Sequence, residues 1–327
     1  MRNMQSSLPA LMVAMSMSLF TTVHADQPPV NLGFTSFLDG GPPAGPGWYY
    51  AQYVQYYTAD KIAGDQGNEL HLPQVLPPRG PQDLTTAGVD AWIFLFQVVY
   101  QSDHAVLWGG KWGLDLILPY VEFDIEPDRV VVLGDSRGWG DLLVGPYLQW
   151  DPVMGPAGPR FMHRVELQVL LPTGEYDRGP DLDPGSNFLS LDPYWAATVF
   201  IGRRWTASWR LHYLWNSRND APDYLVFPEA DTLRWGQAVH GNLATAWELV
   251  PGRLRLGING YFLRQITDTT VDGVKRGDLR EQVYGLGPGL VWHVGRDDHL
   301  FVNAYFEAGA ENRAEGTRIN LRYVHHF

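Results

Sequence analysis

Residues 134–138 read Gly-Asp-Ser-Arg-Gly and match the G-x-S-x-G pattern that presents a nucleophilic serine in hydrolases. That chemistry needs a helix directly after the serine, because the helix aims the hydroxyl and helps to complete the oxyanion hole. The following residues, 138–142, are Gly-Trp-Gly-Asp-Leu, which is a poor helix start. We therefore interpret Ser136 as part of a loop that leads into a strand, and the sequence predicts no catalytic residue.

Three histidines, His212, His240 and His293, have side chains that could serve as acid-base groups or metal ligands. No two of them show the tight spacing along the chain that is typical of metal-binding motifs. Cysteine is absent, so the fold has neither disulfides nor thiolate ligands. We expect these histidines to line a polar interior, and we predict no metal and no cofactor.

The beginning of the chain has the pattern of a secretory signal peptide. Arg2 precedes an apolar stretch at 8–20 and Val-His-Ala at 23–25, so we expect residues 1–25 to be removed. No later apolar run approaches the roughly 18 to 20 residues that a transmembrane helix needs. Aromatic residues make up 13% of the chain and charged residues only 18%, which is low for a water-soluble surface. The net charge of −12 argues against nucleic-acid binding, which requires a basic surface.

Twelve segments alternate apolar and polar residues with the period of two that is typical of β-strands. They are 47–60, 85–101, 105–121, 137–151, 160–173, 191–204, 206–217, 233–249, 252–266, 280–294, 299–311 and 315–327. The connections between them alternate between long and short, as in outer-membrane barrels, which have short periplasmic turns and long outer loops. The sequence thus predicts an all-β transmembrane antiparallel barrel over 47–327, with both termini periplasmic. We expect residues 26–46 to form a periplasmic segment or a plug in the lumen.

The two faces of each predicted strand differ in polarity. At 206–217, for example, Trp209, Leu211 and Tyr213 lie opposite Arg210 and His212. Twelve strands enclose more space than side chains fill, so we expect the apolar face to meet lipid and the polar face to line the lumen. Outward aromatic residues recur eight positions apart, which covers roughly 20 Å of the bilayer normal and predicts two aromatic girdles. The pairs are Trp92 with Tyr100, Trp112 with Tyr120, and Tyr284 with Trp292.

Two predicted strands, 85–101 and 105–121, are apolar on both faces. We expect this sector to give the lumen an apolar wall for apolar solutes, or to pack against segment 26–46, and the two can coexist. The predicted solute pathway consists of lumen-facing side chains, both apolar and charged. They are Ile93, Leu95, Val99, Asp115, Ile117, Arg164, Glu166, Arg210, His212, Arg253, Arg255, Glu307 and Arg322.

Four prolines, Pro119, Pro146, Pro172 and Pro288, lie within predicted strands, where each removes a backbone donor from the ladder. A closed barrel has no free edge at which to place them, so we expect bulges or gaps in strand pairing. We hypothesise that such a gap opens a sideways exit from the lumen into the membrane.

The chain ends in an alternating segment that closes with Phe327 and has Tyr323 four positions earlier. This ending resembles the C-terminal signal by which the barrel-assembly machinery recognises outer-membrane proteins. We therefore expect the protein to lie in the outer membrane of a Gram-negative bacterium, in contact with its lipid and lipopolysaccharide.

Several short motifs in the first two hundred residues resemble one outer-membrane family. They are Gly-Pro-Gly-Trp-Tyr-Tyr at 45–50, Gln-Tyr-Tyr-Thr-Ala-Asp at 55–60, Gly-Trp-Gly-Asp-Leu at 138–142, Leu-Pro-Thr-Gly-Glu-Tyr-Asp at 171–177 and Gly-Ser-Asn at 185–187. The resemblance is to the phenol meta-pathway (MetA-pathway) degradation proteins, which are regarded as channels for hydrophobic compounds. It implies a monomeric twelve-stranded barrel and identifies no catalytic residue.

Together these features predict a channel, and not an enzyme, for passive uptake of small hydrophobic molecules, aromatic ones among them. Two alternatives stay open. A general diffusion or structural barrel would have a lumen lined uniformly with charge, and an outer-membrane lipid hydrolase would need Ser136 or another serine beside a histidine.

Overall fold

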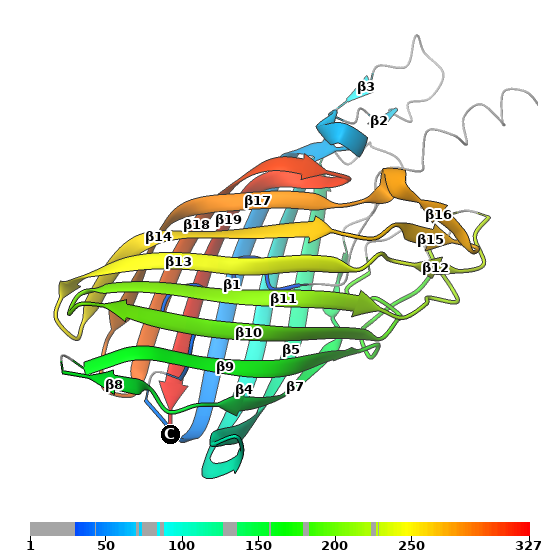
Figure 1. Cartoon of the computed structure of the whole chain (residues 1–327). Helices are drawn as coiled ribbons and strands as arrows, with labels where there is room; N and C mark the ends of the chain where they lie inside the picture. Colours follow the sequence, from blue (N-terminus) through cyan, green and yellow to red (C-terminus); the bar gives the residue numbers. More distant parts are fainter. Residues whose placement is uncertain are drawn as a thin grey trace, which may run out of the picture.

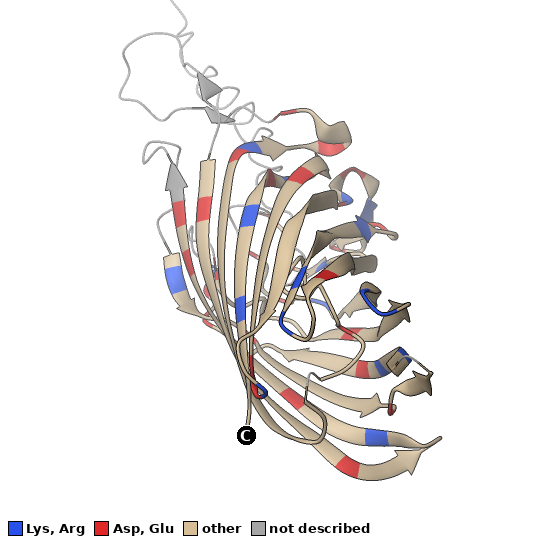
Figure 2. Ribbon diagram, turned by 90° about the vertical axis from the view of Figure 1, so that its left-hand side faces the viewer, with Lys and Arg blue, Asp and Glu red and all other residues tan. Residues whose placement is uncertain are grey.

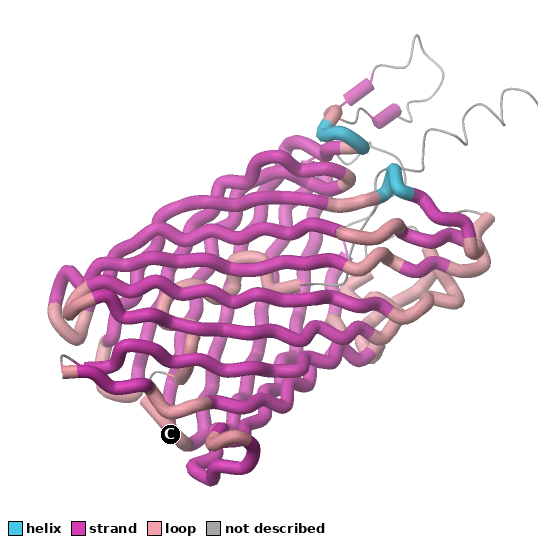
Figure 3. The backbone as a smooth tube through the Cα atoms, in the orientation of Figure 1, coloured by secondary structure: helices cyan, strands magenta, loops and turns pink. Residues whose placement is uncertain are grey.

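The computed structural model describes residues 30–42, 44–69, 72–73, 84–85, 88–126, 136–156, 158–178, 183–223, 227 and 229–327. One antiparallel sheet curls into a closed barrel (Figures 1 and 3). Pairing of β1 (Gly47–Ala63) with β19 (Arg313–His326) joins the first and last strands of the barrel. The predicted signal peptide, 1–25, lies outside the described residues.

Fourteen strands form this sheet, and three of them share one position in the ring. The eleven continuous strands are β1, β4 (Gly88–Leu107), β5 (Gly110–Glu126), β9 (Gly158–Leu171), β10 (Ser190–Ile201), β11 (Trp205–Asn216), β13 (Ala238–Val250), β14 (Leu254–Gln265), β17 (Gln282–His293), β18 (Asp298–Glu311) and β19. The twelfth position, between β5 and β9, is divided among β6 (Ser136–Trp139), β7 (Leu142–Gln149) and β8 (Val153–Gly155). The predicted twelve-stranded antiparallel β-barrel is confirmed.

Smaller elements lie among the long connections. A three-stranded sheet consists of β12 (Leu233–Arg234), β15 (Thr269–Val271) and β16 (Val274–Arg276), and β2 (Leu72–Pro73) pairs with β3 (Leu84–Thr85). The three-stranded sheet lies at the end of the barrel away from the C-terminus (Figure 1). We call this the long-loop end, and the opposite end the short-turn end. Helical structure in the described residues is limited to 3₁₀ turns at Asp65–Gly67 and Gly277–Leu279, and none of it is long and apolar enough to cross a membrane.

One predicted connection is in the wrong place. Residues 102–104 were expected to form a turn, but β4 continues through them to Leu107 with irregular pairing to β5. The chain reverses at Trp108 and Gly109, whose φ angles are 50° and 78°. Two successive residues with positive φ are the geometry of a tight hairpin turn. The polar residues 102–104 belong to a bulge, which period-two alternation does not distinguish from a turn.

The barrel is apolar outside and polar inside. Leu286 is 63% exposed and Ile258 56%, whereas His240 and Gln55 are 0% exposed. Charged residues of both signs are sparse along the strands (Figure 2). A water-soluble barrel would bury its apolar face, so this reversed polarity fits a barrel whose outer surface meets lipid.

Outward aromatic rings form two groups along β1, β4, β5 and β6. At the short-turn end Tyr100 contacts Trp48 and Trp112, with ring centroids 4.8 and 5.2 Å away. Toward the long-loop end Tyr56 contacts Trp92, and Tyr120 contacts Trp139, at 4.8 and 5.1 Å. The two groups lie where aromatic belts flank the apolar band of a membrane barrel.

Strand pairing is interrupted at three of the four predicted prolines. The chain leaves the sheet at Gly140 and Asp141, between β6 and β7, where it faces Pro119. The β7–β9 ladder lapses between Val144 and Tyr147, around Pro146. The β17–β18 ladder lapses between Leu286 and Gly289, around Pro288. Pro172 lies outside the ladder, directly after the last residue of β9. Two of these gaps flank the same strand, β7.

Candidate solute pathway through the barrel

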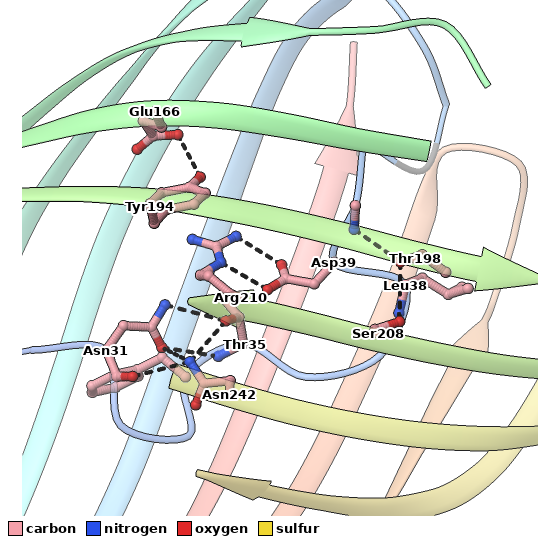
Figure 4. A network of polar contacts seen from close by, with 12 residues as sticks. Asn31, Thr35, Leu38, Asp39, Glu166, Tyr194, Thr198, Ser208, Arg210 and Asn242 are labelled. Carbon is pink, nitrogen blue, oxygen red and sulfur yellow. Dashed lines mark hydrogen bonds and ion pairs between the residues drawn. The ribbon is translucent and has the colours of Figure 1, made fainter. Parts of the chain in front are cut away.

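Residues 30–42 run inside the barrel, where barrel side chains satisfy their backbone groups. Asn242 accepts from the Gly33 amide at 2.8 Å and donates to the Asn31 carbonyl at 3.0 Å (Figure 4). Ser208 accepts from the Leu38 amide at 3.0 Å, and Thr198 from the Gly40 amide at 2.9 Å. Buried backbone groups need such partners, and this segment pairs with no strand.

Apolar side chains of the same segment pack against β13, β14, β17 and β18. Phe37 is 1% exposed and packs beside Ala246, Val291 and Phe301. An added Cβ on Gly289 would lie 2.7 Å from the Phe37 ring, and one on Gly257 2.6 Å from it. The glycines on the inner face of these strands therefore leave the space that Phe37 fills.

A buried ion pair joins segment 30–42 to β11. The Arg210 guanidinium donates from Nε and Nη2 to the two carboxylate oxygens of Asp39, both at 2.7 Å (Figure 4). The two side chains are 4% and 5% exposed. Burial by itself raises the pKa of Asp39, but the positive charges of Arg210, Arg322 and Arg164 bring the pKa below its ordinary value. Asp39 thus lies among three buried arginines, of which Arg210 makes the ion pair.

A cavity of about 340 Å³ lies between this segment and the long-loop end. Its wall includes the inner face of β4 and β5, with Ile93, Leu95 and Ile117, three residues of the predicted pathway. Phe34 packs against Ile93 and Leu95, so the wall both contacts the N-terminal segment and borders open space. Tyr176, in the connection between β9 and β10, also lines the cavity, and burial raises the pKa of its phenol. We call this space the apolar cavity.

A second cavity, of about 610 Å³, lies on the short-turn side of the segment. Val99, Arg164, Arg255 and Arg322 of the predicted pathway line it, together with Asp39. Arg210, Tyr53 and Gln97 border both cavities. The Asp39–Arg210 ion pair therefore lies at the partition between the two spaces.

Three acidic residues of the predicted pathway face the interior but are held by other side chains. Asp115 accepts from Gln97 at 2.7 Å, and Glu166 accepts from Tyr194 at 2.5 Å. Glu307 accepts from Arg318 at 3.0 Å and from two tyrosines. These carboxylates build the wall and do not line either cavity.

The barrel brings two histidines together although they are distant in the sequence. His212 on β11 and His240 on β13 stack with ring centroids 4.1 Å apart. Asp192 on β10 lies 2.9 Å from His212 Nδ1 and 3.1 Å from His240 Nε2. The three residues offer ligand atoms within 4.8 Å of one another. Spacing along the chain gave no sign of this cluster, because each residue comes from a different strand.

Two residues singled out in the sequence lie away from both cavities. Arg253 was expected on a strand facing the lumen, but β14 begins at Leu254, and Arg253 lies exposed in the turn that precedes it. Arg253 has the same parity as the lumen-facing Arg255, and period-two alternation does not show at which residue the strand begins. Ser136 begins β6 and is followed by strand residues, so the helix required by a nucleophile elbow is absent there.

The family model described as "Putative MetA-pathway of phenol degradation" matches residues 75–323, which is more than half of the chain. The chain belongs to this family. Its members are the proteins that the motifs at 138–142 and 171–177 resemble, so the predicted family is confirmed. No curated protein matches the chain.

The fold of this family member matches that of a solved bacterial channel. A crystal structure of an outer membrane channel from Pseudomonas putida F1 has a TM-score of 0.72 and 18% identity, and the match covers 91% of this chain and 100% of that one. The beta domain of the Bordetella autotransporter BrkA and a Pseudomonas aeruginosa FadL homologue have TM-scores of 0.45 and 0.43, at 12% and 13% identity, over 86% and 92% of this chain and 100% and 99% of theirs. The last two scores are too low to support an argument. The first shows that this chain has the barrel fold of an outer-membrane channel.

Sequence reasoning missed Asp39 as a site residue. It is the only charged residue between positions 27 and 59, in an otherwise apolar and Gly/Pro-rich stretch. A lone carboxylate in such a stretch predicts a buried partner, because an unpaired buried charge is costly. The partner could not be identified, since Arg210 lies 171 positions away and several lumen arginines were equivalent candidates.

Proposed function

We propose that this chain is an outer-membrane channel of a Gram-negative bacterium for passive uptake of small hydrophobic molecules, aromatic ones among them. In this proposal residues 1–25 are a cleaved signal peptide, 26–46 plug the lumen, and 47–327 form the barrel. The chain acts as a monomer, both termini are periplasmic, and the barrel-assembly machinery recognises the strand that ends in Phe327. The solute's own gradient drives uptake.

The apolar cavity carries this proposal. A general diffusion pore would present charge around its whole lumen, whereas here Ile93, Leu95 and Ile117 line a space of about 340 Å³. That volume is within the range of small-molecule sites, which are mostly apolar with a few polar groups. The segment that closes the lumen beneath this cavity also argues against free passage of hydrophilic solutes.

The strand interruptions around β7 support a sideways exit from the apolar cavity. Pro119, Leu143 and Leu170 line the cavity, and they belong to β5, β7 and β9, the strands that flank the gaps. Pro146 removes one ladder donor between β7 and β9, so these strands separate at a lower cost than continuously paired strands. A solute would leave through this wall into the membrane and would not need to pass Asp39 and Arg210.

Uptake into proteoliposomes tests the function. Apolar aromatic compounds such as toluene should enter protein-containing vesicles faster than empty ones, whereas sugars of similar size should not. A faster entry of sugars than of apolar compounds would favour the general diffusion barrel. The Ser136→Ala variant tests the hydrolase alternative. If the purified barrel hydrolyses esters and this variant does not, the channel proposal is overturned.

A further inference from the structure

Three buried arginines surround the place that Asp39 occupies. Arg164, Arg210 and Arg322 are 9%, 4% and 7% exposed, and all three border the larger cavity. They come from β9, β11 and β19, so only closure of the barrel brings them to one level. Each guanidinium also lies over an aromatic ring, at 5.0 Å from Tyr147, 4.2 Å from Tyr194 and 3.7 Å from Phe301, respectively.

The arginines have more binding capacity than Asp39 uses. Among the described residues, Arg210 alone of the three has a carboxylate within ion-pair distance. The Nε atoms of Arg164 and Arg322 are buried and have no hydrogen-bond partner in the described part of the chain. Glu166 and Asp115 lie on the neighbouring wall, but Tyr194 and Gln97 already donate to their carboxylates. Planar guanidinium groups with free donors are suited to binding a carboxylate through two hydrogen bonds.

Asp39 belongs to a segment that is not part of the sheet. Residues 30–42 are held by side-chain contacts and not by a strand ladder, so they can leave while the barrel stays closed. If Asp39 left with the segment, Arg210 would lose its ion-pair partner, and Arg164 and Arg322 would lose a nearby negative charge. An external carboxylate would restore the charge balance, and the neighbouring apolar cavity would receive its apolar part because Arg210 borders both spaces.

We infer that Arg164, Arg210 and Arg322 form a carboxylate-binding site, which Asp39 occupies in the closed channel. The solutes that open the channel are then amphipathic organic acids, with an aromatic or aliphatic body and one carboxylate. This inference rests on the proposed function and adds a second substrate class to it: neutral apolar solutes leave through the β7 wall, whereas organic acids open the partition at Asp39. The solute carboxylate displaces Asp39, segment 30–42 loses its ion pair, and the two cavities join. A neutral analogue lacks the group that competes with Asp39 and cannot shift this equilibrium.

Thiol labelling tests the displacement directly. The chain has no cysteine, and Ser36 is 2% exposed, so Ser36→Cys provides a single thiol that is shielded in the closed channel. The full chain in lipid nanodiscs is treated with a water-soluble maleimide in the presence of benzoate, benzamide or inorganic phosphate. Benzoate should accelerate labelling about fivefold or more, as is typical of coupled binding, and benzamide and phosphate should not.

Variants in the Ser36→Cys background distinguish benzoate binding at the arginines from a general loosening of segment 30–42. Arg322→Met and, independently, Arg164→Met should abolish the benzoate response while barrel folding is retained, and Asp39→Asn should give fast labelling without any solute. The matched control is Asn31→Ala, which removes the side-chain oxygen that accepts from Asn242 at 2.9 Å but keeps Asp39 and the arginines. It should raise the basal rate and keep the response to benzoate.

Equal acceleration by benzamide, or by phosphate alone, would overturn the carboxylate site. So would an unchanged benzoate response in both arginine variants. Labelling that ignores benzoate while proteoliposomes still take up toluene would refute this inference and leave the proposed function intact. Failure of toluene uptake together with a benzoate response would refute the proposed function and leave the binding site intact.

Discussion

Two sectors of this barrel differ in the side chains that they present to the lumen, although both are built from antiparallel strands. The sector of β4, β5, β7 and β9 supplies the apolar wall of the apolar cavity and contains two of the three strand interruptions. The sector of β10, β11, β13, β14, β17, β18 and β19 carries buried polar side chains and holds segment 30–42. We call these the apolar sector and the anchoring sector. The difference suggests that movement is concentrated where few polar contacts cross between strands, and rigidity where many do.

Removing segment 30–42 should have the largest effect, because the anchoring sector would lose the only described chain that separates the two cavities. Deletion of residues 30–42 should raise single-channel conductance and sugar permeation by roughly an order of magnitude, since twelve strands enclose a lumen wider than the side chains fill. Planar bilayer recordings measure this. An unchanged conductance would show that the segment is not the barrier.

A covalent link between β7 and β9 in the apolar sector should slow solute uptake without opening the lumen. Leu143 on β7 and Leu170 on β9 are paired residues that line the apolar cavity. A disulfide between cysteines at these two positions should slow toluene uptake severalfold, and reduction should restore it. The matched control joins Leu263 and Val283, which are paired in the anchoring sector on β14 and β17. Equal slowing by both disulfides would contradict a route through the β7 wall.

The stability of the anchoring sector should depend on Asp192. Its carboxylate accepts from His212 and His240, which are buried in the wall. Asp192→Leu should destabilise the barrel by about 1–3 kcal/mol for each imidazole that loses its acceptor. Asp192→Asn keeps one acceptor oxygen and should cost less. Urea unfolding in lipid, followed by tryptophan fluorescence, measures both, and an unchanged midpoint for the Leu variant would show that the cluster adds no stability.

A polar group in the apolar cavity should change transport more than stability. Ile117→Asn places an amide on the cavity wall, where water compensates part of its hydrogen bonding, so the expected loss of stability is about 1 kcal/mol. Toluene uptake should fall severalfold, because the apolar contact for the solute is reduced. Toluene uptake equal to that of the unmodified protein would show that the apolar cavity is not part of the transport route.

The smallest effects are expected from two arginines near the start of β14, one in the lumen and one in the preceding turn. Arg255 borders the larger cavity and pairs with Glu248 at 3.0 Å, whereas Arg253 lies exposed in the preceding turn. Arg253→Ala should leave stability within about 0.5 kcal/mol and should not alter ion selectivity. Arg255→Ala should shift selectivity measurably toward cations in the 30–42 deletion. The reverse result would place Arg253, and not Arg255, beside the ion pathway and would contradict this assignment.

Sequence alone determined the barrel and its reversed polarity. Period-two alternation is local and repeats in every strand, and it can be recognised without knowing which strands are neighbours. The apolar inner face of Ile93, Leu95 and Ile117 was visible for the same reason. Turn positions were less certain, since the bulge at 102–104 has the composition of a turn.

Only the tertiary structure decided which side chains meet across the lumen. Asp39 pairs with Arg210, and His212 joins His240 and Asp192, because ring closure fixes the height and angle of each strand. Such contacts depend on register and on the barrel's circumference, which no local pattern records. The sequence supplied the charges and the apolar wall, and closure of the sheet placed them on either side of one segment.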